Sequence, residues 1–278
     1  MSLKHELQTE KFYATGVENF GNFHGNHLSF GLWEDGIEDY VSAAERLLKR
    51  VGVKIQLDND SRLLDVACGM GSQDKYFLRE FSCRSIDALD LTAAHIELAK
   101  KYYSDSKINY QKGNACALPY QDQSFTHITG IEGPANFNTR EVFFNEAFRV
   151  LKSGGRIGLS DYCLPSDKIS WFGRKFVEWV AYFWKVPKEN VYAASEYASK
   201  LERAGFTDVH IEVVSQNVIP QYVAEHRKPE VKRELNNIRG RVYGRLSCVL
   251  DTGVEVLYNK GLLDYILVSA KKPEIISS

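Results

Sequence analysis

Hydrophobic residues recur with two different periods along this chain, and the two periods alternate. Between residues 37 and 52 apolar side chains return every three or four positions, which predicts an amphipathic helix ended by Gly52. The short apolar run 62–67 that follows predicts a buried strand. The alternation continues to residue 161, with further strands expected at 85–91, 108–111, 124–132 and 156–161, and helices at 72–81, 92–103 and 139–151.

Polar and glycine residues predict where some of these elements begin and end. Thr92 can cap the helix that it opens by accepting a backbone N–H in the first turn. The glycine-rich triplet Ser153 to Gly155 is expected to end the helix before it and to lead into a strand. Farther along, Ser195 is the expected cap of a helix that Gly205 stops.

The part of the chain after residue 161 is less regular. An aromatic-rich stretch comes first, and the helix at 195–205 follows it. Residues 207–214 predict a strand with Val209, Ile211 and Val213 on one apolar face. Residues 216–258 are polar, irregular or helical, and 262–272 predicts a last strand.

Strands that alternate with helices of this length form parallel βαβ units, and helices then cover both faces of the sheet. We therefore expect an α/β fold: a doubly wound, mostly parallel sheet of seven strands with an N-terminal helical segment and an aromatic-rich cap. The expected regions are an N-terminal segment (1–36), a binding core (37–165), cap insertions (166–194 and 216–258) and the C-terminal part of the core (195–215 and 259–278).

Composition narrows the class of ligand. The chain has 278 residues, 44% of them hydrophobic, and a net charge of −1. This balance gives no general basic surface for nucleic acid, so a small molecule is the expected partner.

No stretch approaches the roughly 20 apolar residues that cross a bilayer. Five cysteines without a CxxC pair indicate reduced thiols, and with no apolar leader this favours a cytoplasmic protein.

The stretch LLDVACGMG, residues 63–71, places a glycine turn directly after the first core strand. A nicotinamide dinucleotide fingerprint would carry a third glycine where this chain has Asp74. Asp65 at the end of the strand would also oppose the charge of a pyrophosphate. The sequence therefore favours a cofactor that carries sulfonium and ammonium groups and no phosphate. About 20 residues farther on, Asp90 ends the next strand and can accept the hydroxyls of a ribose.

Several motifs together resemble the class I S-adenosylmethionine-dependent methyltransferases. These motifs are LLDVACGMG, ALDLT, GNACALPYQDQSF and EAFRVLKSGGRIGLSDY, in this order within residues 37–165. The resemblance implies a Rossmann-like fold, S-adenosylmethionine as cofactor and S-adenosylhomocysteine as product. It assigns cofactor binding to Asp65, Ala67, Gly69 and Gly71 at the methionine end, Asp90 and Leu91 at the ribose, Asn114 and Ala115 at the adenine, and Glu132. Asn114 departs from the family, which usually has aspartate there.

The acid or base of the reaction is less clearly marked. Relatives that act on small metabolites often carry a histidine shortly after the fourth strand, and this chain has none there. Glu132 and Asp161, each at the end of a strand, are the first candidates, and Glu132 could equally hold the amino group of the cofactor. His24 and His27 in the N-terminal segment are further candidates, although each could be an ordinary hydrogen-bonding residue. No cluster of metal ligands accompanies them, so we expect no metal.

The acceptor site is expected under the cap. The N-terminal run that contains Tyr13 resembles the segment that closes the site in tocopherol, sugar and phosphobase methyltransferases. Asn136 follows the fourth strand, and residues 170–184 carry Trp171, Phe176 and Trp179 among other aromatics. These residues suggest a lipophilic or aromatic acceptor, while core packing or docking on a membrane surface are the other interpretations of the aromatic helix.

The hypothesis from the sequence is an enzyme that transfers a methyl group from S-adenosylmethionine to an oxygen, nitrogen or carbon of a small metabolite, by in-line displacement in an enclosed site. The alternative is a non-catalytic protein that binds S-adenosylmethionine. A nicotinamide oxidoreductase and a protein or RNA methyltransferase fit the residues less well. We expect a small-molecule acceptor as partner, no nucleic acid, no stable membrane insertion, and a monomer or homodimer.

Overall fold

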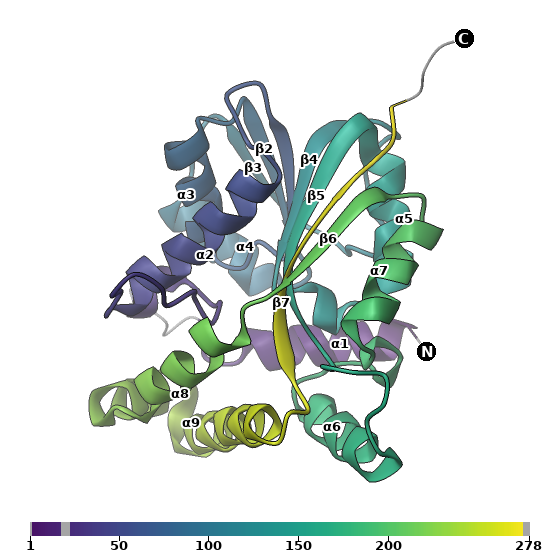
Figure 1. Ribbon diagram of the computed structural model, residues 1–278. Helices are drawn as coiled ribbons and strands as arrows, with labels where there is room; N and C mark the ends of the chain where they lie inside the picture. The colour runs from purple at the N-terminus through teal and green to yellow at the C-terminus, as the bar shows by residue number, and fades with distance from the viewer. Residues whose placement is uncertain (1, 18–22, 275–278) are drawn as a thin grey trace.

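The computed structural model describes residues 2–17 and 23–274, without the side chains of 2, 23, 239 and 241–248. Its centre is a seven-stranded sheet with the order β3-β2-β1-β4-β5-β7-β6 (Figure 1). Only β7 runs antiparallel to its neighbours in this sheet. The strands are β1 (Arg62–Val66), β2 (Ser85–Asp90), β3 (Ile108–Lys112), β4 (Phe125–Ile131), β5 (Leu151–Cys163), β6 (Thr207–Val213) and β7 (Asp264–Lys271). The expected doubly wound α/β fold is confirmed.

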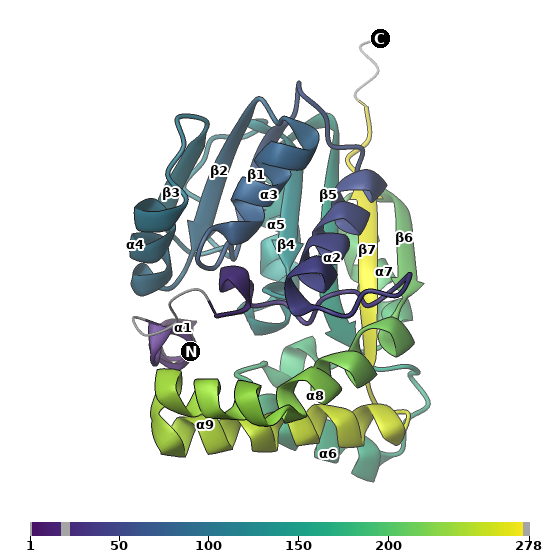
Figure 2. The same cartoon turned by 90° about the vertical axis from the view of Figure 1, so that its left-hand side faces the viewer.

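Helices cover both faces of the sheet (Figures 1 and 2). One face carries α2 (Tyr40–Lys54), α3 (Ser72–Phe81) and α4 (Ala93–Tyr102), and the other carries α5 (Arg140–Val150) and α7 (Ala194–Arg203). Each layer buries its own apolar cluster against the strands, with Leu47 and Phe77 fully buried on the first side and Phe143 and Leu201 on the second. Burial of this kind is the main source of the stability of the fold.

The remaining helices lie beyond the carboxyl ends of the parallel strands (Figures 1 and 2). They are α1 (Ser2–Ala14), α6 (Trp171–Phe183), α8 (Ile219–Arg227) and α9 (Pro229–Asn259). Short 3₁₀ turns are found at Phe23–Asn26, Pro134–Asn136, Lys188–Asn190 and Ser215–Asn217. In a parallel sheet the loops that bind ligands leave the strands at this same end. The four helices therefore lie where they can enclose a ligand.

Two of the expected helix ends are wrong. Helix α2 runs through Gly52 to Lys54, and the glycine serves packing there, since a Cβ at this position would come within 2.5 Å of the Phe81 ring. Helix α7 begins at Ala194, and the hydroxyl of Ser195 donates to Asp167 at 2.5 Å instead of capping the helix. In both places a contact with a distant part of the chain overrides the local signal.

Three smaller expectations also differ from the structure. Strand β5 already begins at Leu151, so Ser153 to Gly155 lie within the strand and not in a turn before it. Thr92 occupies the N-cap position of α4, but its side chain makes no capping hydrogen bond. Val213 is 54% exposed at the end of β6, so the apolar face of this strand does not extend to it.

Some features of the chain bear on its environment. Among the described residues, no helix is both long and apolar enough to cross a membrane. The four cysteines whose side chains the structure describes, Cys68, Cys83, Cys116 and Cys163, are unpaired. Burial raises the pKa of the Cys68 thiol well above its ordinary value, so this thiol is protonated and unreactive at neutral pH.

Candidate active site

A cavity of about 290 Å³ lies between the carboxyl ends of the strands and the four capping helices. Its wall on the sheet side comes from the loops after β1, β2, β3 and β4. Its wall on the cap side is largely apolar and includes Val177 and Val180 of α6 and Val254 and Leu257 of α9. Enclosed cavities with an apolar wall and a few polar groups are the usual form of small-molecule sites.

The turn after β1 brings its backbone to the cavity. Gly69 and Ala67 line the cavity and have φ of 56° and 59°, and the N–H of Gly69 donates to Asp90 at 3.0 Å. Gly71, with φ of 91°, does not line the cavity. A Cβ on Gly71 would come within 2.9 Å of Ala99, so this glycine allows the turn to pack against α4.

Asp65 does not lie on the cavity wall, in contrast to the expectation. Its side chain is fully buried and accepts hydrogen bonds from Thr129 at 2.7 Å and from Gln73 at 2.5 Å. Gln73 lines the cavity in its place. Burial raises the pKa of Asp65 to about 6, and burial together with the nearby charge of Asp65 raises that of Asp74 well above the ordinary range. Ser72 and Gln73, in the first turn of α3, are thus the polar side chains that line the cavity directly after this loop.

Asp90 lines the cavity as an ionised carboxylate. Burial raises its pKa, but the charge of His95 and the N–H groups of Thr92 and Gly69 outweigh burial, so the pKa lies below its ordinary value. Oδ1 accepts from the N–H of Thr92 at 2.7 Å and lies 3.2 Å from the ring nitrogen Nδ1 of His95. The carboxylate is therefore held rigidly at the end of β2, beside Leu91, which also lines the cavity.

Asn114 and Ala115 form the next part of the wall after β3, and α1 closes over them. The Oδ1 of Asn114 accepts from the N–H of Cys116 at 2.8 Å, and its Nδ2 donates to the carboxylate of Glu6 at 2.9 Å. A second acid of α1, Glu10, pairs with Lys112 at 2.6 Å. Glu6 lines the cavity as well, so helix α1 contributes a carboxylate to the site.

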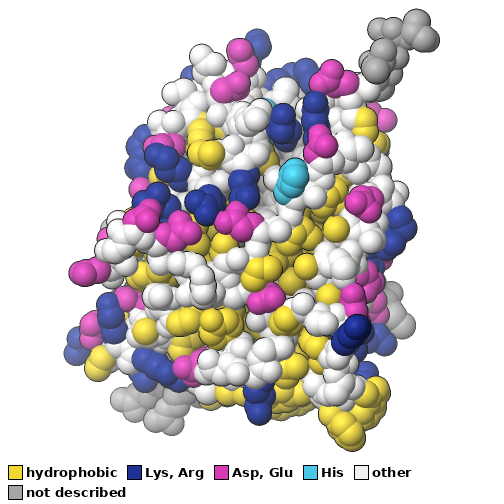
Figure 3. Space-filling model, viewed as in Figure 1, with side chains coloured by type: hydrophobic (Ala, Val, Ile, Leu, Met, Phe, Trp, Pro, Cys, Tyr) yellow, Lys and Arg dark blue, Asp and Glu magenta, His cyan; other side chains and the backbone are white. Residues whose placement is uncertain are grey.

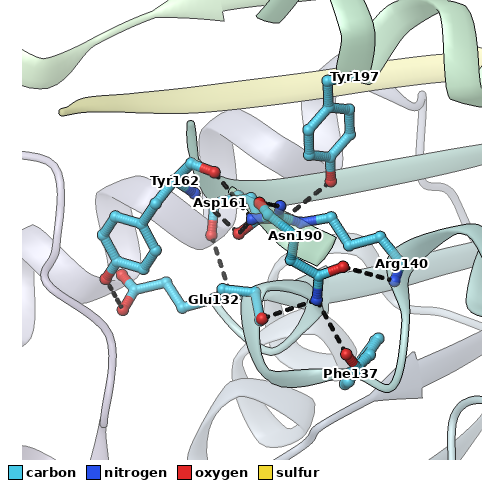
Figure 4. Close-up of polar contacts among 9 residues, drawn as sticks. Glu132, Phe137, Arg140, Asp161, Tyr162, Asn190 and Tyr197 are labelled. Atoms are coloured by element: carbon cyan, nitrogen blue, oxygen red, sulfur yellow. Dashed lines mark hydrogen bonds and ion pairs between the residues drawn. The ribbon is translucent and has the colours of Figure 1, made fainter. Parts of the chain in front are cut away.

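Glu132 lies at the end of β4 with φ of 57°, and its carboxyl group accepts several hydrogen bonds, of which Figure 4 shows the one from Tyr162. Oε1 accepts from the N–H of Phe30 and from the hydroxyl of Tyr265, both at 2.7 Å, and Oε2 accepts from the hydroxyl of Tyr162 at 2.8 Å. Burial raises the pKa of Glu132 to about 7, although these hydrogen bonds act in the opposite direction. The side chain of Glu132 therefore lines the cavity and also links the segments that carry Phe30, Tyr162 and Tyr265.

Asp161 is part of a buried ion pair and does not line the cavity, so the expectation that it faces an acceptor is wrong (Figure 4). Arg140 donates to both of its oxygens, at 2.7 and 2.9 Å, and the hydroxyl of Tyr197 donates at 2.9 Å. The side chains of the pair are 1% and 0% exposed. An acid that is saturated with donors behind the wall cannot act as a base on a ligand in the cavity.

His24, His27, Tyr13 and Asn136 all line the cavity. Burial lowers the pKa of His24 to about 3 and that of His27 to about 4, so both rings are neutral at pH 7. The ring of His24 stacks on Tyr40 with centroids 3.7 Å apart. Tyr13 donates to Asn136 at 3.1 Å, which joins α1 to the turn after β4. The N-terminal run also includes residues 18–22, which lie outside the described residues.

Helix α6 turns its aromatic residues away from the cavity. Trp171 and Trp179 are 66% and 60% exposed, and neither they nor Phe176 lines the cavity. The residues that do line it are Val177, Val180, Ala181 and, just after the helix, Trp184. The expected aromatic helix is present, but the assignment of Trp171, Phe176 and Trp179 to the acceptor is wrong.

Several known proteins with similar sequences are methyltransferases, and so are several solved structures of similar fold. A further structure of similar fold, with a TM-score of 0.73 at 22% identity over 94% of this chain, is that of the [4+2]-cyclase SpnF. The erythromycin 3''-O-methyltransferase of Saccharopolyspora erythraea is 26% identical over 260 residues, which cover 90% of this chain and 84% of that protein. The 27-O-demethylrifamycin SV methyltransferase of Amycolatopsis mediterranei is 26% identical over 290 residues, which cover 95% and 96%. The geranyl diphosphate C-methyltransferase of Streptomyces coelicolor A3(2), solved with S-adenosyl-L-homocysteine, superimposes with a TM-score of 0.76 at 15% identity, over 96% of this chain and 97% of that one.

The core of the chain also matches a family model directly. Residues 64–159, from β1 to β5, match the model described as "Methyltransferase domain". The chain thus carries a methyltransferase domain, and along most of its length it is similar to S-adenosylmethionine-dependent methyltransferases. It is therefore an enzyme, and S-adenosylmethionine is its methyl donor.

The polar groups of the methyltransferase cavity fit this cofactor. An ionised carboxylate at the end of β2, Asp90, suits two ribose hydroxyls, and the small side chain of Ala115 leaves room for a flat ring beside it. No basic side chain from the turn after β1 lines the cavity, as a phosphate-free cofactor requires. When bound, the cofactor supplies an electrophilic methyl group, and the residues of the chain orient the acceptor against it.

Sequence reasoning missed several residues that line the methyltransferase cavity. Glu6 and Gln73 lie on helices whose local sequence gives no sign of a ligand. His226 of α8 and Asp251 of α9 lie at the cap side, where Asp251 accepts from Tyr222 at 3.2 Å. The sequence around Asp251 shows an acid next to apolar residues of a helix. This pattern points to a site only when the position of α9 over the cavity is known.

We predict that Asp161→Asn destabilises the methyltransferase by about 3–5 kcal/mol, because it leaves the buried charge of Arg140 without a partner. Urea unfolding measures the effect. The matched control is Asp122→Asn, which breaks the exposed pair with Arg149 and should cost less than about 1 kcal/mol. Normal stability of Asp161→Asn with loss of turnover would instead support a catalytic role for this acid.

Proposed function

We propose that this methyltransferase methylates a hydroxyl oxygen of a bulky, lipophilic small molecule. The observation that carries the proposal is the composition of the cavity: beyond the part that suits the cofactor, α6 and α9 contribute the aliphatic side chains of Val177, Val180, Val254 and Leu257. Apolar walls of this kind gain free energy by removing apolar ligand surface from water. Two relatives named for O-methylation, those for erythromycin and demethylrifamycin, support an oxygen acceptor.

The proposed arrangement places the donor along the ends of β1 to β4. The ribose hydroxyls meet Asp90, and the backbone at Ala67 and Gly69 with the amide of Gln73 meets the amino-acid end. The methyl group then faces the cap side of the cavity, where the acceptor lies. Holding two reactants in line within an enclosed site accounts for much of the rate enhancement that such an enzyme needs.

Recognition of the adenine requires an acceptor for its amino group. Both polar atoms of Asn114 already have partners, Cys116 and Glu6. The carboxylate of Glu6 uses one oxygen to accept from Asn114, and its other oxygen is able to accept from the adenine amino group. We propose that Glu6 takes the role that an aspartate at position 114 has in related enzymes, so that α1 contributes to cofactor binding.

We propose that His24 or His27 of the N-terminal segment accepts a hydrogen bond from the acceptor hydroxyl, since both rings line the cavity and are neutral at pH 7. Their lowered pKa values make them weak bases, so the proton passes to a ring only as the new bond from carbon to oxygen gives the hydroxyl oxygen positive charge. Glu132 is better suited to positioning, because both of its oxygens already accept hydrogen bonds from Phe30, Tyr162 and Tyr265. Asn136 and Tyr13, which are joined to each other, are proposed to border the acceptor.

We predict transfer of label from methyl-labelled S-adenosylmethionine into a lipophilic fraction of a metabolite extract, after calorimetry has established cofactor binding. The product should release its label on cleavage of a methyl ether. Label on nitrogen or carbon would contradict the hydroxyl acceptor, although not methyl transfer itself. Binding without transfer to any metabolite, protein or RNA fraction would favour the alternative, a non-catalytic cofactor-binding protein.

We predict that Glu6→Gln weakens the binding of S-adenosylhomocysteine about tenfold, because it removes a charged acceptor from the adenine amino group. Calorimetry measures this directly. S-inosylhomocysteine, in which a carbonyl replaces the amino group, should bind the variant and the wild type with similar affinity. The control is Glu10→Gln, a change on the same helix as Glu6 that weakens the ion pair between Glu10 and Lys112 of β3. Equal losses for both variants would show that Glu6 acts only by holding α1 in place.

A further inference from the structure

The two faces of α6 are both apolar, but only one of them is buried. Val177 and Val180 on the inner face are each 5% exposed and line the cavity. The outer face carries large rings in water: Trp171 is 66% exposed, Phe172 78% and Trp179 60%. We call the exposed rings of this helix the aromatic face; its members are Trp171, Phe172, Trp179, Tyr182 and Phe183.

The rings of the aromatic face form two groups along the helix, each with rings in contact. Trp171 contacts Phe172 with centroids 5.0 Å apart, and Phe183 contacts both Trp179 at 5.1 Å and Tyr182 at 5.7 Å. Figure 3 shows hydrophobic side chains gathered at the corner of the molecule where α6 lies in Figure 1. A cluster of exposed aromatic residues on a soluble surface marks a place where another apolar body binds.

The segment around the aromatic face carries positive charge, whereas the chain as a whole has a net charge of −1. Residues 165–189 contain five lysines or arginines and three acids, a net charge of +2. Lys168 precedes the helix and Lys188 follows it, both with exposed side chains. Lys185 lies 5.5 Å from the ring centre of Tyr182. Cations therefore border the rings at both ends of the helix.

We propose that the aromatic face docks α6 on the surface of a bilayer that contains anionic phospholipids. Tryptophan and tyrosine rings favour the interfacial layer of a membrane, and lysines at its border favour anionic headgroups. The positive charge of this segment, on a chain whose net charge is −1, favours an anionic surface as the occupant, and association with a protein is an outcome of the test. Docking would place the cavity, which the inner face of the same helix lines, next to the bilayer. This proposal goes beyond methyl transfer and does not require a particular acceptor.

Sedimentation with vesicles tests the proposal on the full chain. We expect the wild type to sediment with vesicles of phosphatidylcholine and phosphatidylglycerol, more weakly with phosphatidylcholine alone, and less at high salt. The double variant Trp171→Ala/Trp179→Ala should lose about tenfold or more in its partition onto the anionic vesicles. Since both side chains are exposed, the variant should fold and bind S-adenosylhomocysteine normally, which calorimetry checks.

Tyr102→Ala provides the matched control. Tyr102 is an exposed ring on α4, 51% accessible, with Lys101 beside it at 4.7 Å, and its loss should leave vesicle binding unchanged. Three results would overturn the proposal: no sedimentation of the wild type with either vesicle, equal binding by the double variant, or equal losses for Tyr102→Ala. Vesicle-independent association of the wild type that the double variant abolishes would identify the face as a protein interface instead.

Discussion

The buried carboxyl group of Glu132 joins three parts of the chain that are far apart in sequence. Its oxygens accept from the backbone of Phe30 in the N-terminal segment, from Tyr162 at the end of β5 and from Tyr265 at the start of β7. The backbone N–H of Glu132 donates to the carbonyl of Ser160 at 2.9 Å. Without this group the N-terminal segment would lose a fixed attachment to the sheet, and three buried donors would lose their acceptor.

A second buried side chain, that of Asn190, fixes another part of the cavity wall, the turn after β4. Asn190, just before α7, donates to the carbonyls of Ala135 and Phe137, both at 2.9 Å, and accepts from the N–H of Arg140 (Figure 4). Arg140 in turn neutralises Asp161. The loop that leads from α6 back to the core is thereby fixed to the turn after β4. These two polar groups fix segments of the cavity wall to one another, while the apolar layers supply most of the stability.

The sequence was sufficient for the fold and for the nature of the donor. Apolar periods located all seven strands, and the turn at Gly69 with the acid at Asp90 identified a nucleoside-binding site, because these signals are local. Asp161 was misjudged since its partner Arg140 is 21 residues away and no spacing links them. The aromatic face of α6 was assigned to the acceptor because a helical period shows that two faces differ and not which one points inward. Glu6 was missed because it reaches the site only through the docking of α1.

Donor and acceptor are proposed to share one cavity, which the N-terminal segment closes through its hydrogen bond to Glu132. A crystal structure of the complex with S-adenosylhomocysteine would show whether they do. We expect that the ribose hydroxyls contact Asp90, that the sulfur atom faces the apolar side chains of α6 and α9, and that the Phe30–Glu132 hydrogen bond stays intact. A cofactor bound outside this cavity, or a sulfur atom directed away from the cap with the N-terminal segment detached, would contradict it.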